Sequence, residues 1–398
     1  MPILGLHRNA IVSQLVPEQW NFNGTVNAIA LERNANGTAT GKIYVGGNFT
    51  RYNGSVVNRI IRLNSNGTID STFNVGVGFD NVVRTIVPVS GSTGIYVGGT
   101  FNSYSGSTVS KLVRINSNGT LDTTFNPGVV STSVDGIRAI ALASGSSQIY
   151  VGGDFISYSG SSINRIARVN SNGTLDTAFN VGLGAYYSVG GTANAVLGIL
   201  PVTQSDGQIY IVGSFNMYSG SQVNGIASIN ANGTLVGTSS FNPGVGNGAG
   251  FNNSAFTIQQ VLNSTSIYVG GAFTTYSGSA VSKLVRINSN GTLDTTFNVG
   301  TGFSPATNVT TCIANTLDGS GDIFVGGTTF TAYSGSSGHG RIIRLRSNGT
   351  INTSVSFGAG FNAQVLAIEP TSSAQVYMGG SFTTYKGSTY NYIIKLTS

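Results

Sequence analysis

The sequence predicts an all-β protein: a seven-bladed β-propeller of four-stranded blades, with the ring closed by the N-terminal strand, which completes the last blade. Three observations support this fold. A single motif returns seven times along the 398 residues. Each copy holds short runs of β-branched and aromatic residues bounded by Gly, Ser and Asn. The last copy lacks its fourth run, whereas the N-terminus has a spare one.

The motif is clearest in the second copy, which reads IYVGGTFNSYSGSTVSKLVRINSNGTLDTTFNPG from Ile95 to Gly128. Related text recurs roughly every 55 residues, a period typical of propellers built from four-stranded units, and no long stretch has helical periodicity. We therefore expect one domain over residues 1–398. Its seven units are expected at approximately 23–75, 82–127, 137–181, 194–243, 255–299, 309–358 and 363–398, the last joined by 11–21.

Each unit is expected to hold four strands, which in the second copy are residues 83–89, 94–101, 110–116 and 120–126. The turn before the fourth strand contains Asn118 and Gly119, and suits a three-residue hairpin loop with a left-handed glycine. This register places Arg114 opposite Asp122 and an apolar pair beside them.

The same Arg and Asp positions recur with an eight-residue spacing, which indicates structural ion pairs. In the fourth copy both charges are absent, leaving Ser228 and Val236, and this fits because one charge without its partner is costly in a buried sheet. The sixth keeps Arg344 but has Asn352, which can still accept a hydrogen bond. The four complete pairs are Arg62/Asp70, Arg114/Asp122, Arg168/Asp176 and Arg286/Asp294.

The two chain ends complement each other. The seventh copy stops after its third strand, at YNYIIKLTS, and residues 11–21 end in Trp20-Asn21, which matches the Phe-Asn of the other fourth strands. We expect this segment to supply the missing outer strand and to cover sheet edges that would otherwise be exposed. An open solenoid is the alternative, although it does not require complementary ends.

The signature GGxFxxYxGSxxxxLxRxNSNGTLDTTFN resembles the delta-60 repeat family of bacterial and phage β-propellers. The resemblance covers nearly the whole chain and departs from the family pattern at Ser228 and Val236. It implies the propeller fold and no particular activity. Such repeats occur in secreted bacterial surface proteins and in phage structural proteins.

Composition argues against several classes of function. The net charge is +6 with no basic run, which is unlike a nucleic-acid binder. The single cysteine, Cys312, and only two histidines make a metal cluster or a nucleophile–histidine site improbable. LDGSGD, from Leu317 to Asp322, lacks the carboxylate pattern of a calcium loop. We therefore expect no catalytic site, no metal, no cofactor, no nucleic acid partner and no membrane insertion.

One aromatic position is occupied in every copy, just before the small-residue turn between the second and third strands. A ring of tyrosines there can stack on sugars or, alternatively, pack against its own hairpin with its hydroxyl bonded to backbone; an identical residue in each repeat favours the packing role. The seven residues are Tyr52, Tyr104, Tyr158, Tyr218, Tyr276, Tyr333 and Tyr385. A repeated basic position, Arg59 and its equivalents, is expected to be a solvated edge or a basic band.

The connections between repeats vary most in sequence, and variable loops on a constant scaffold are where recognition usually lies. We expect these loops to share a face with the tyrosine hairpins, opposite the NSNGT turns. The candidate binding face is Tyr186, Tyr187, Asn247, Phe251 and Phe303, although the two phenylalanines can also be tucked between blades.

These features predict a non-enzymatic interaction protein that docks to partner proteins or to a host surface. We expect a virion component, such as a phage tail or capsid-associated protein, because the first 20 residues have no signal-peptide pattern and the composition is rich in Ser, Thr, Gly and Asn. The alternatives are a glycan-binding lectin or adhesin and a secreted cell-surface propeller. A hydrolase is a more distant one.

Overall fold

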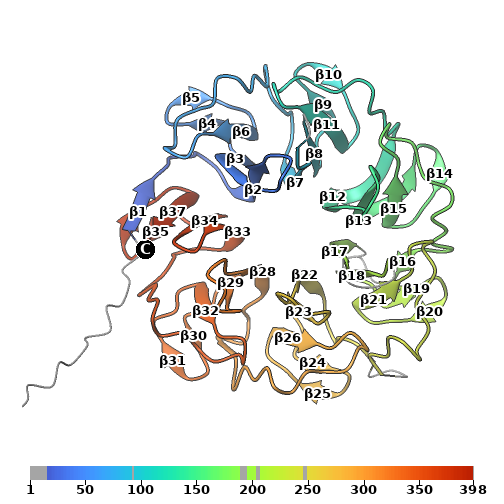
Figure 1. Cartoon of the computed structure of the whole chain (residues 1–398), viewed down its shortest axis with the longest axis vertical. Helices are drawn as coiled ribbons and strands as arrows, with labels where there is room; N and C mark the ends of the chain where they lie inside the picture. Colours follow the sequence, from blue (N-terminus) through green and yellow to red (C-terminus); the bar gives the residue numbers. More distant parts are fainter. Residues whose placement is uncertain (1–15, 92–93, 189–194, 203–206, 245–248, 398) are drawn as a thin grey trace, which may run out of the picture.

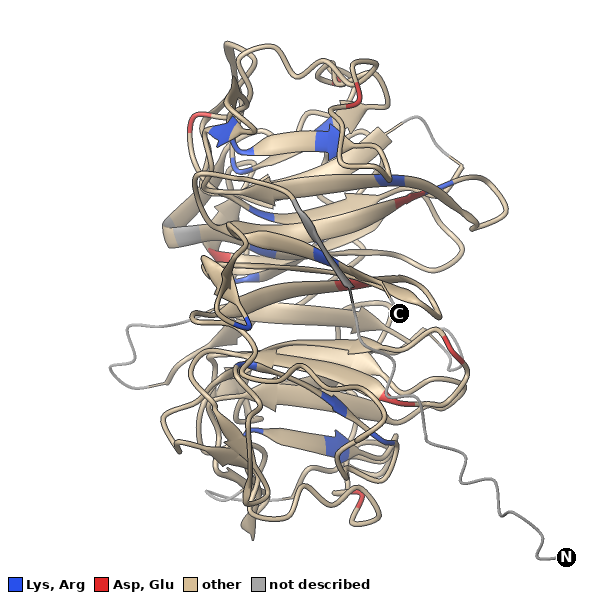
Figure 2. Ribbon diagram, turned by 90° about the vertical axis from the view of Figure 1, so that its left-hand side faces the viewer, with Lys and Arg blue, Asp and Glu red and all other residues tan. Residues whose placement is uncertain are grey.

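The computed structural model describes residues 16–91, 94–188, 195–202, 207–244 and 249–397. These residues form small antiparallel sheets arranged around a common centre (Figure 1). From the side the molecule is a disc, in which Lys and Arg positions are spread over the sheets rather than gathered on one face (Figure 2). The described part of the chain contains strands and no helix, so it holds no helix that could cross a membrane.

Each repeat contributes a sheet of three main strands in the order inner, middle and third, paired antiparallel. The inner strands line the centre of the ring (Figure 1). They are β2 (Val26–Arg33), β7 (Val83–Pro88), β12 (Val130–Leu142), β17 (Val196–Pro201), β22 (Ala255–Gln260), β28 (Thr310–Asn315) and β33 (Val365–Ser372). The middle strands are β3 (Ala39–Gly47), β8 (Gly94–Gly99), β13 (Ile149–Tyr158), β18 (Ile209–Gly213), β23 (Ile267–Gly271), β29 (Ile323–Gly327) and β34 (Gln375–Gly380). The third strands are β6 (Ile60–Leu63), β11 (Leu112–Asn116), β15 (Ile166–Val169), β21 (Ile226–Ile229), β26 (Leu284–Ile287), β32 (Ile342–Leu345) and β37 (Ile393–Thr397).

Short two-residue strands connect the middle and third strands and lie at the outer rim (Figure 1). Each carries the tyrosine of its repeat or pairs with the strand that does. They are β4 (Arg51–Tyr52), β5 (Ser55–Val56), β9 (Ser103–Tyr104), β10 (Ser107–Thr108), β14 (Ser161–Ser162), β19 (Met217–Tyr218), β20 (Ser221–Gln222), β24 (Thr275–Tyr276), β25 (Ser279–Ala280), β30 (Ala332–Tyr333), β31 (Ser336–Ser337), β35 (Thr384–Tyr385) and β36 (Ser388–Thr389), with β16 (Ala185–Tyr186) and β27 (Phe303–Ser304) pairing beside β19 and β30.

The repeated glycine pair of the middle strand allows neighbouring sheets to pack closely. A Cβ on Gly46 would lie 2.5 Å from Val83 in the next inner strand, well inside van der Waals contact. The same holds at the end of the chain, where a Cβ on Gly379 would lie 2.5 Å from Val26 in the first inner strand. The glycine is therefore a packing residue between sheets, and the last sheet packs on the first as each sheet packs on its successor.

The prediction of a fourth strand in each of the first six repeats is wrong, because that segment forms only a single bridge to the third strand. The turn itself follows the predicted register, because Ile115 bridges Leu121 and Gly119 has φ of 89°. After that single bridge, the Asp122 carboxylate accepts the N–H and the hydroxyl of Thr124, and the chain turns away from the sheet. Local side-chain capping of this kind competes with strand pairing, and it recurs at Asp70 and Asp294.

The N-terminal segment pairs with the last sheet. Strand β1 (Val16–Gln19) runs antiparallel to β37, with Pro17 opposite Leu396, and gives the sheet order β1-β37-β34-β33. Trp20 follows it and packs on Tyr377, their ring centroids 5.1 Å apart. Of the expected segment 11–21, residues 11–15 lie outside the described residues. The third repeat also differs, because β12 begins at Val130, before the expected start at residue 137, and continues through irregular pairing.

Candidate binding site

The four predicted Arg–Asp pairs are present and have a structural role. Arg62 Nε lies 2.6 Å from Asp70 Oδ2, Arg168 and Arg286 each lie 2.7 Å from their partners, and Arg114 contacts Asp122. Burial opposes ionisation of Asp70, yet hydrogen bonds from Lys42 and Thr72 and the charge of Arg62 hold its pKa well below its usual range. These carboxylates are therefore fixed anions inside the sheets.

The same arginines also reach the next repeat. Arg62 donates to the carbonyl of Ser117 at 2.8 Å, and Arg114 donates to that of Ser171 at 3.1 Å. In the fourth repeat, where the arginine is absent, the Tyr210 hydroxyl donates to Ser289 instead. The repeated turn is thus an acceptor for the preceding sheet.

In the sixth repeat the sequence prediction for Asn352 is wrong. Arg344 Nε lies 2.8 Å from Asp322 Oδ2, and Arg344 also contacts Asp318, both from the LDGSGD hairpin. The Asn352 amide donates to Asp322 instead of accepting from Arg344. Because the missing carboxylate is supplied from a different hairpin, the eight-residue spacing could not reveal it.

The tyrosine ring is buried and joined to backbone. Each of the first six hydroxyls donates to the carbonyl of the repeat's turn glycine, as Tyr52 does to Gly67 at 2.6 Å and Tyr158 to Gly173 at 2.7 Å. Burial raises the pKa of Tyr52 to about 12. Each of the six tyrosines is therefore joined to the NSNGT turn of its own repeat by its side chain. Tyr385, in the repeat without that turn, has no hydrogen-bond partner for its hydroxyl among the described residues.

The repeated basic residues are not a solvated edge. Arg59 has φ of 68° and donates to the carbonyl of Phe79 at 2.8 Å, and Lys283 has φ of 66° and donates to Ala272 at 2.8 Å. In the fourth repeat Gly225 takes this left-handed position. These side chains are committed to backbone carbonyls within the sheets.

The predicted binding face is brought together only in part. Phe251 and Phe303 are 5% and 4% exposed and pack on Tyr276 and Tyr333, so they belong to the core. Tyr187 is 44% exposed and Tyr186 is half-buried in β16. Asn247 lies outside the described residues. Two of the four aromatic residues predicted to form the binding face are therefore core residues.

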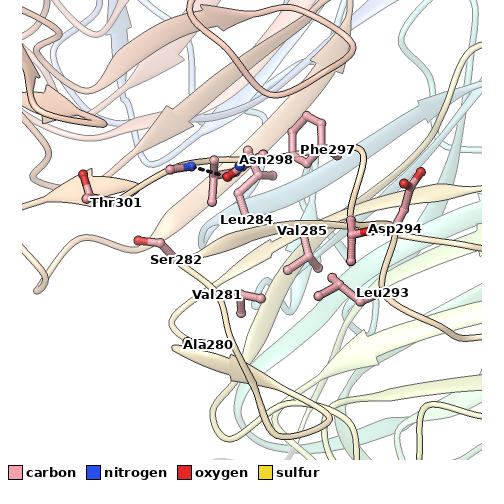
Figure 3. Close-up of a pocket in the computed structure, with 13 residues that line it drawn as sticks. Ala280, Val281, Ser282, Leu284, Val285, Leu293, Asp294, Phe297, Asn298 and Thr301 are labelled. Atoms are coloured by element: carbon pink, nitrogen blue, oxygen red, sulfur yellow. Dashed lines mark hydrogen bonds between the residues drawn. The ribbon is translucent and has the colours of Figure 1, made fainter.

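An outer cleft occurs beside the hairpins. In the fifth repeat it has a volume of about 420 Å³ and lies between Val281, Leu293 and Asn298 (Figure 3). The equivalent residues of the second repeat, including Val109, Leu121 and Asn126, line a similar cleft. Because equivalent residues line this cleft in two repeats, it arises from the shared repeat sequence, and its lining does not distinguish one repeat from the other.

A second cavity, of about 470 Å³, lies at the centre of the ring and is built differently. In every inner strand the pairing skips one residue at a β-bulge, as between Val83 and Thr85 and between Ala255 and Thr257. A bulge re-aims the skipped side chain. The seven skipped residues are Asn27, Arg84, Arg138, Leu197, Phe256, Thr311 and Leu366, and all seven line this cavity.

The sequence contains a signal for this cavity in the four residues around each bulge, and motif spacing alone does not reveal it. The skipped residue is the second in a four-residue segment that recurs in every repeat. The first residue of the segment is small or branched and buried, and the fourth is an isoleucine that is buried or half-buried. The segments read VNAI, VRTI, IRAI, VLGI, AFTI, TTCI and VLAI. The second position varies most, from amide to guanidinium to aromatic, whereas the first and third positions hold only small or β-branched residues. One variable position in a constant frame is the mark of recognition.

Other reactive groups do not form a site. Cys312 is buried, and burial raises the pKa of its thiol to about 12, so it is not a thiolate nucleophile. His339 contacts Ser336 on an exposed hairpin, and burial lowers its pKa. Among the described residues no group of three or more His, Cys, Asp or Glu side chains is placed to hold a metal ion.

Comparison with curated proteins finds no match. Among solved structures, the chain is similar to the extracellular domain of a putative one-component system from B. thetaiotaomicron, at 14% identity and a TM-score of 0.54. It is also similar to the extracellular domain of a putative hybrid two-component system from the same organism, at 12% identity and a TM-score of 0.50. The alignments cover 96% of this chain in each case but 40% and 42% of those chains, so the likeness shows a shared fold.

The sequence profile described as "Domain of unknown function (DUF5122) beta-propeller" matches six segments of the chain, each spanning the middle strand, the third strand and the turn that follows. The segments are 38–73, 93–125, 147–179, 204–235, 266–297 and 319–354, and together they cover just over half of the residues. This all-β chain therefore belongs to the DUF5122 beta-propeller family.

Proposed function

We propose that this protein is a non-enzymatic binding propeller that receives a ligand in the central cavity. The observation that carries the proposal is the set of seven bulged residues, of five residue types, that converge on one cavity. Clefts and cavities of about 300–1,000 Å³ lined by apolar groups and a few polar ones are typical of small-molecule sites. The bulged positions vary within strands that are otherwise repeated framework, so the cavity is one place where this protein differs from a bare scaffold.

The proposal includes the fine architecture of the scaffold: seven blades of the delta-60 repeat type, with the ring closed by the N-terminal strand. Three contacts support closure. Strand β1 pairs with β37, Gly379 packs on Val26, and Lys395 donates to Ser65 at 3.1 Å. A closed ring holds the seven bulges at fixed positions, which favours binding because little ordering of the site is required.

We further propose that the protein acts outside the cell. Support comes from the two similar structures, which are extracellular domains. The expected docking role on a virion stays a prediction. Mass spectrometry of purified virions and of washed cell surfaces of the source organism would separate these locations.

The test of cavity binding uses ligand-observed NMR on the full chain, with a library that contains neutral, anionic and cationic small molecules and short glycans. Leu197→Trp fills the cavity, whereas Val56→Trp places the same side chain on an exposed rim position. We expect hits with wild type and Val56→Trp that disappear with Leu197→Trp. Hits that persist in Leu197→Trp, or the absence of any hit, would overturn the proposal.

A further inference from the structure

Resting on the proposed function, we infer that the central cavity takes a small organic acid with a carboxylate at one end and a ring face at the other, the class to which acidic sugars belong. The inference comes from the order of the bulged residues around the ring. Two guanidinium groups occupy consecutive positions, and Phe256, Thr311 and Leu366 occupy the positions farthest from them around the ring.

The cationic wall is formed by Arg84 in β7 and Arg138 in β12, two inner strands that pack side by side. No Asp or Glu occurs among the described residues that line the cavity. Guanidinium groups bind carboxylates through paired N–H donors, a geometry that a lysine ammonium does not offer. Electrostatic attraction is strengthened where the walls of a cavity exclude water.

The apolar wall is formed by Phe256 in β22 and Leu366 in β33, on either side of Thr311 in β28, whereas Leu197 in β17 neighbours Arg138. An aromatic face and a leucine suit the C–H face of a ring and do not suit a fully hydrated inorganic ion. The order around the ring, from β7 and β12 through β17 to β22, separates Phe256 from the arginines across the opening.

Uncharged polar groups complete the lining, with Asn27 between Leu366 and Arg84 in the ring order and Thr311 within the apolar wall. Asn27 donates through Nδ2 to the carbonyl of Val83, and Thr311 donates through Oγ1 to that of Val365, so both side chains are held in fixed orientations. Gln364 and Thr328 also line the cavity. Amide and hydroxyl groups placed beside an aromatic residue can hydrogen-bond the hydroxyls of a sugar ring, which favours an acidic sugar over a plain fatty acid.

Isothermal titration calorimetry on the full chain tests the inference with three probes: glucuronate, glucose and sulfate. Glucuronate has both the carboxylate and the ring, glucose has the ring alone, and sulfate has the charge alone. We expect glucuronate to bind at least tenfold more tightly than either of the others, with an affinity that falls as salt is raised. Equal binding of glucose, or no binding of glucuronate, would overturn the inference.

Variants locate the binding. Arg84→Gln with Arg138→Gln should weaken glucuronate binding at least tenfold, Phe256→Leu should weaken it severalfold, and the exposed rim variant Arg346→Gln should leave it unchanged. Unchanged affinity in the double arginine variant would contradict the inference, provided that its melting temperature matches wild type.

The two proposals fail separately. If the NMR library gives cavity hits that are neutral or cationic and glucuronate does not bind, the binding role stands and the acidic class is wrong. If cavity-filling Leu197→Trp leaves every hit in place, both proposals fail.

Discussion

The side-chain ammonium of Lys395 donates a hydrogen bond to the carbonyl oxygen of Ser65, 3.1 Å away and 330 residues earlier in the chain. Lys395 occupies the position in the seventh repeat that Arg62 and Arg114 occupy in the first and second, and those arginines donate to the equivalent turn of the next repeat. In the strand pairing of β1 with β37, Lys395 lies opposite Glu18, just as Arg114 lies opposite Asp122 in the second repeat. The last sheet therefore holds the first by the same contact that joins successive sheets.

Lys395→Met tests this contact. The substitution keeps an unbranched chain of similar size but removes the charged donor, and leaves the Ser65 carbonyl without that partner. We expect a loss of about 1–3 kcal/mol in the free energy of unfolding, measured by urea denaturation. Lys386→Met is the exposed counterpart: its ammonium donates to the carbonyl of Ser356 at 3.2 Å on the surface, so its loss should change stability by less than about 0.5 kcal/mol. Equal effects of the two variants would contradict a joining role for Lys395.

The tyrosine ring offers a matched comparison within one chain. Tyr158 donates to Gly173 at 2.7 Å, whereas the buried Tyr385 hydroxyl has no partner among the described residues. Tyr158→Phe should therefore cost about 1 kcal/mol, and Tyr385→Phe should be neutral or stabilising, because it removes a buried polar group that is not paired. Thermal unfolding of both variants checks this. If Tyr385→Phe is the more destabilising change, an acceptor outside the described residues holds its hydroxyl.

The charge network of the sixth repeat can be rewired. Asp322 is 4% exposed and is paired with Arg344 at 2.8 Å. Asp322→Asn should destabilise the protein by about 2–4 kcal/mol, because Arg344 loses a buried carboxylate. Adding Asn352→Asp places a carboxylate where the other repeats have one and should recover at least half of the loss. A double variant no more stable than Asp322→Asn would show that the two positions are not interchangeable.

The repeat pattern predicted most of the sheet framework because its causes are local. β-branched runs, the left-handed Gly119 and the eight-residue Arg114–Asp122 spacing each depend on neighbours within one repeat, and the observed bridge between Ile115 and Leu121 follows from them. The prediction of the fourth strand was wrong for a reason that is also local. The run TLDTTFN has strand-like composition, but the Asp122 carboxylate caps the next residues and ends the pairing after one bridge.

The site was harder to predict because it depends on register. Phe251 and Phe303 sit in variable loops yet are buried against Tyr276 and Tyr333, and nothing local distinguishes a packed phenylalanine from an exposed one. Conversely, Arg84 and Phe256 lie in strands that read as core. Only the skipped pairing at the bulge directs their side chains to a common cavity, and a bulge is visible in strand pairing but not in composition.

The pH dependence of stability should have two limbs with different causes. The pKa values of Asp70, Asp122, Asp176 and Asp294 are lowered in the folded protein, because hydrogen bonds and the paired arginines outweigh burial. Their stabilising contribution is present above the unfolded pKa of about 4 and is lost as the pH falls below it. Glu369 in β33 behaves in the opposite way: burial outweighs the charge of Arg33 and the N–H of Leu31, and raises its pKa to about 7.

A raised folded pKa means that the contribution of Glu369 is fully present below its unfolded pKa, about 4.5, and is lost as the pH rises through about 7. Wild type should therefore lose about 1–3 kcal/mol of stability between pH 5 and pH 8, measured as the urea midpoint at each pH. Glu369→Gln, which is neutral throughout, should largely abolish this loss. His339→Gln is the control, because histidine titrates in the same window, and it should leave the loss in place. Because burial lowers the pKa of His339, this group adds stability as the pH rises and cannot cause the loss. If the loss persists in Glu369→Gln, Glu369 is ionised in the folded protein at neutral pH.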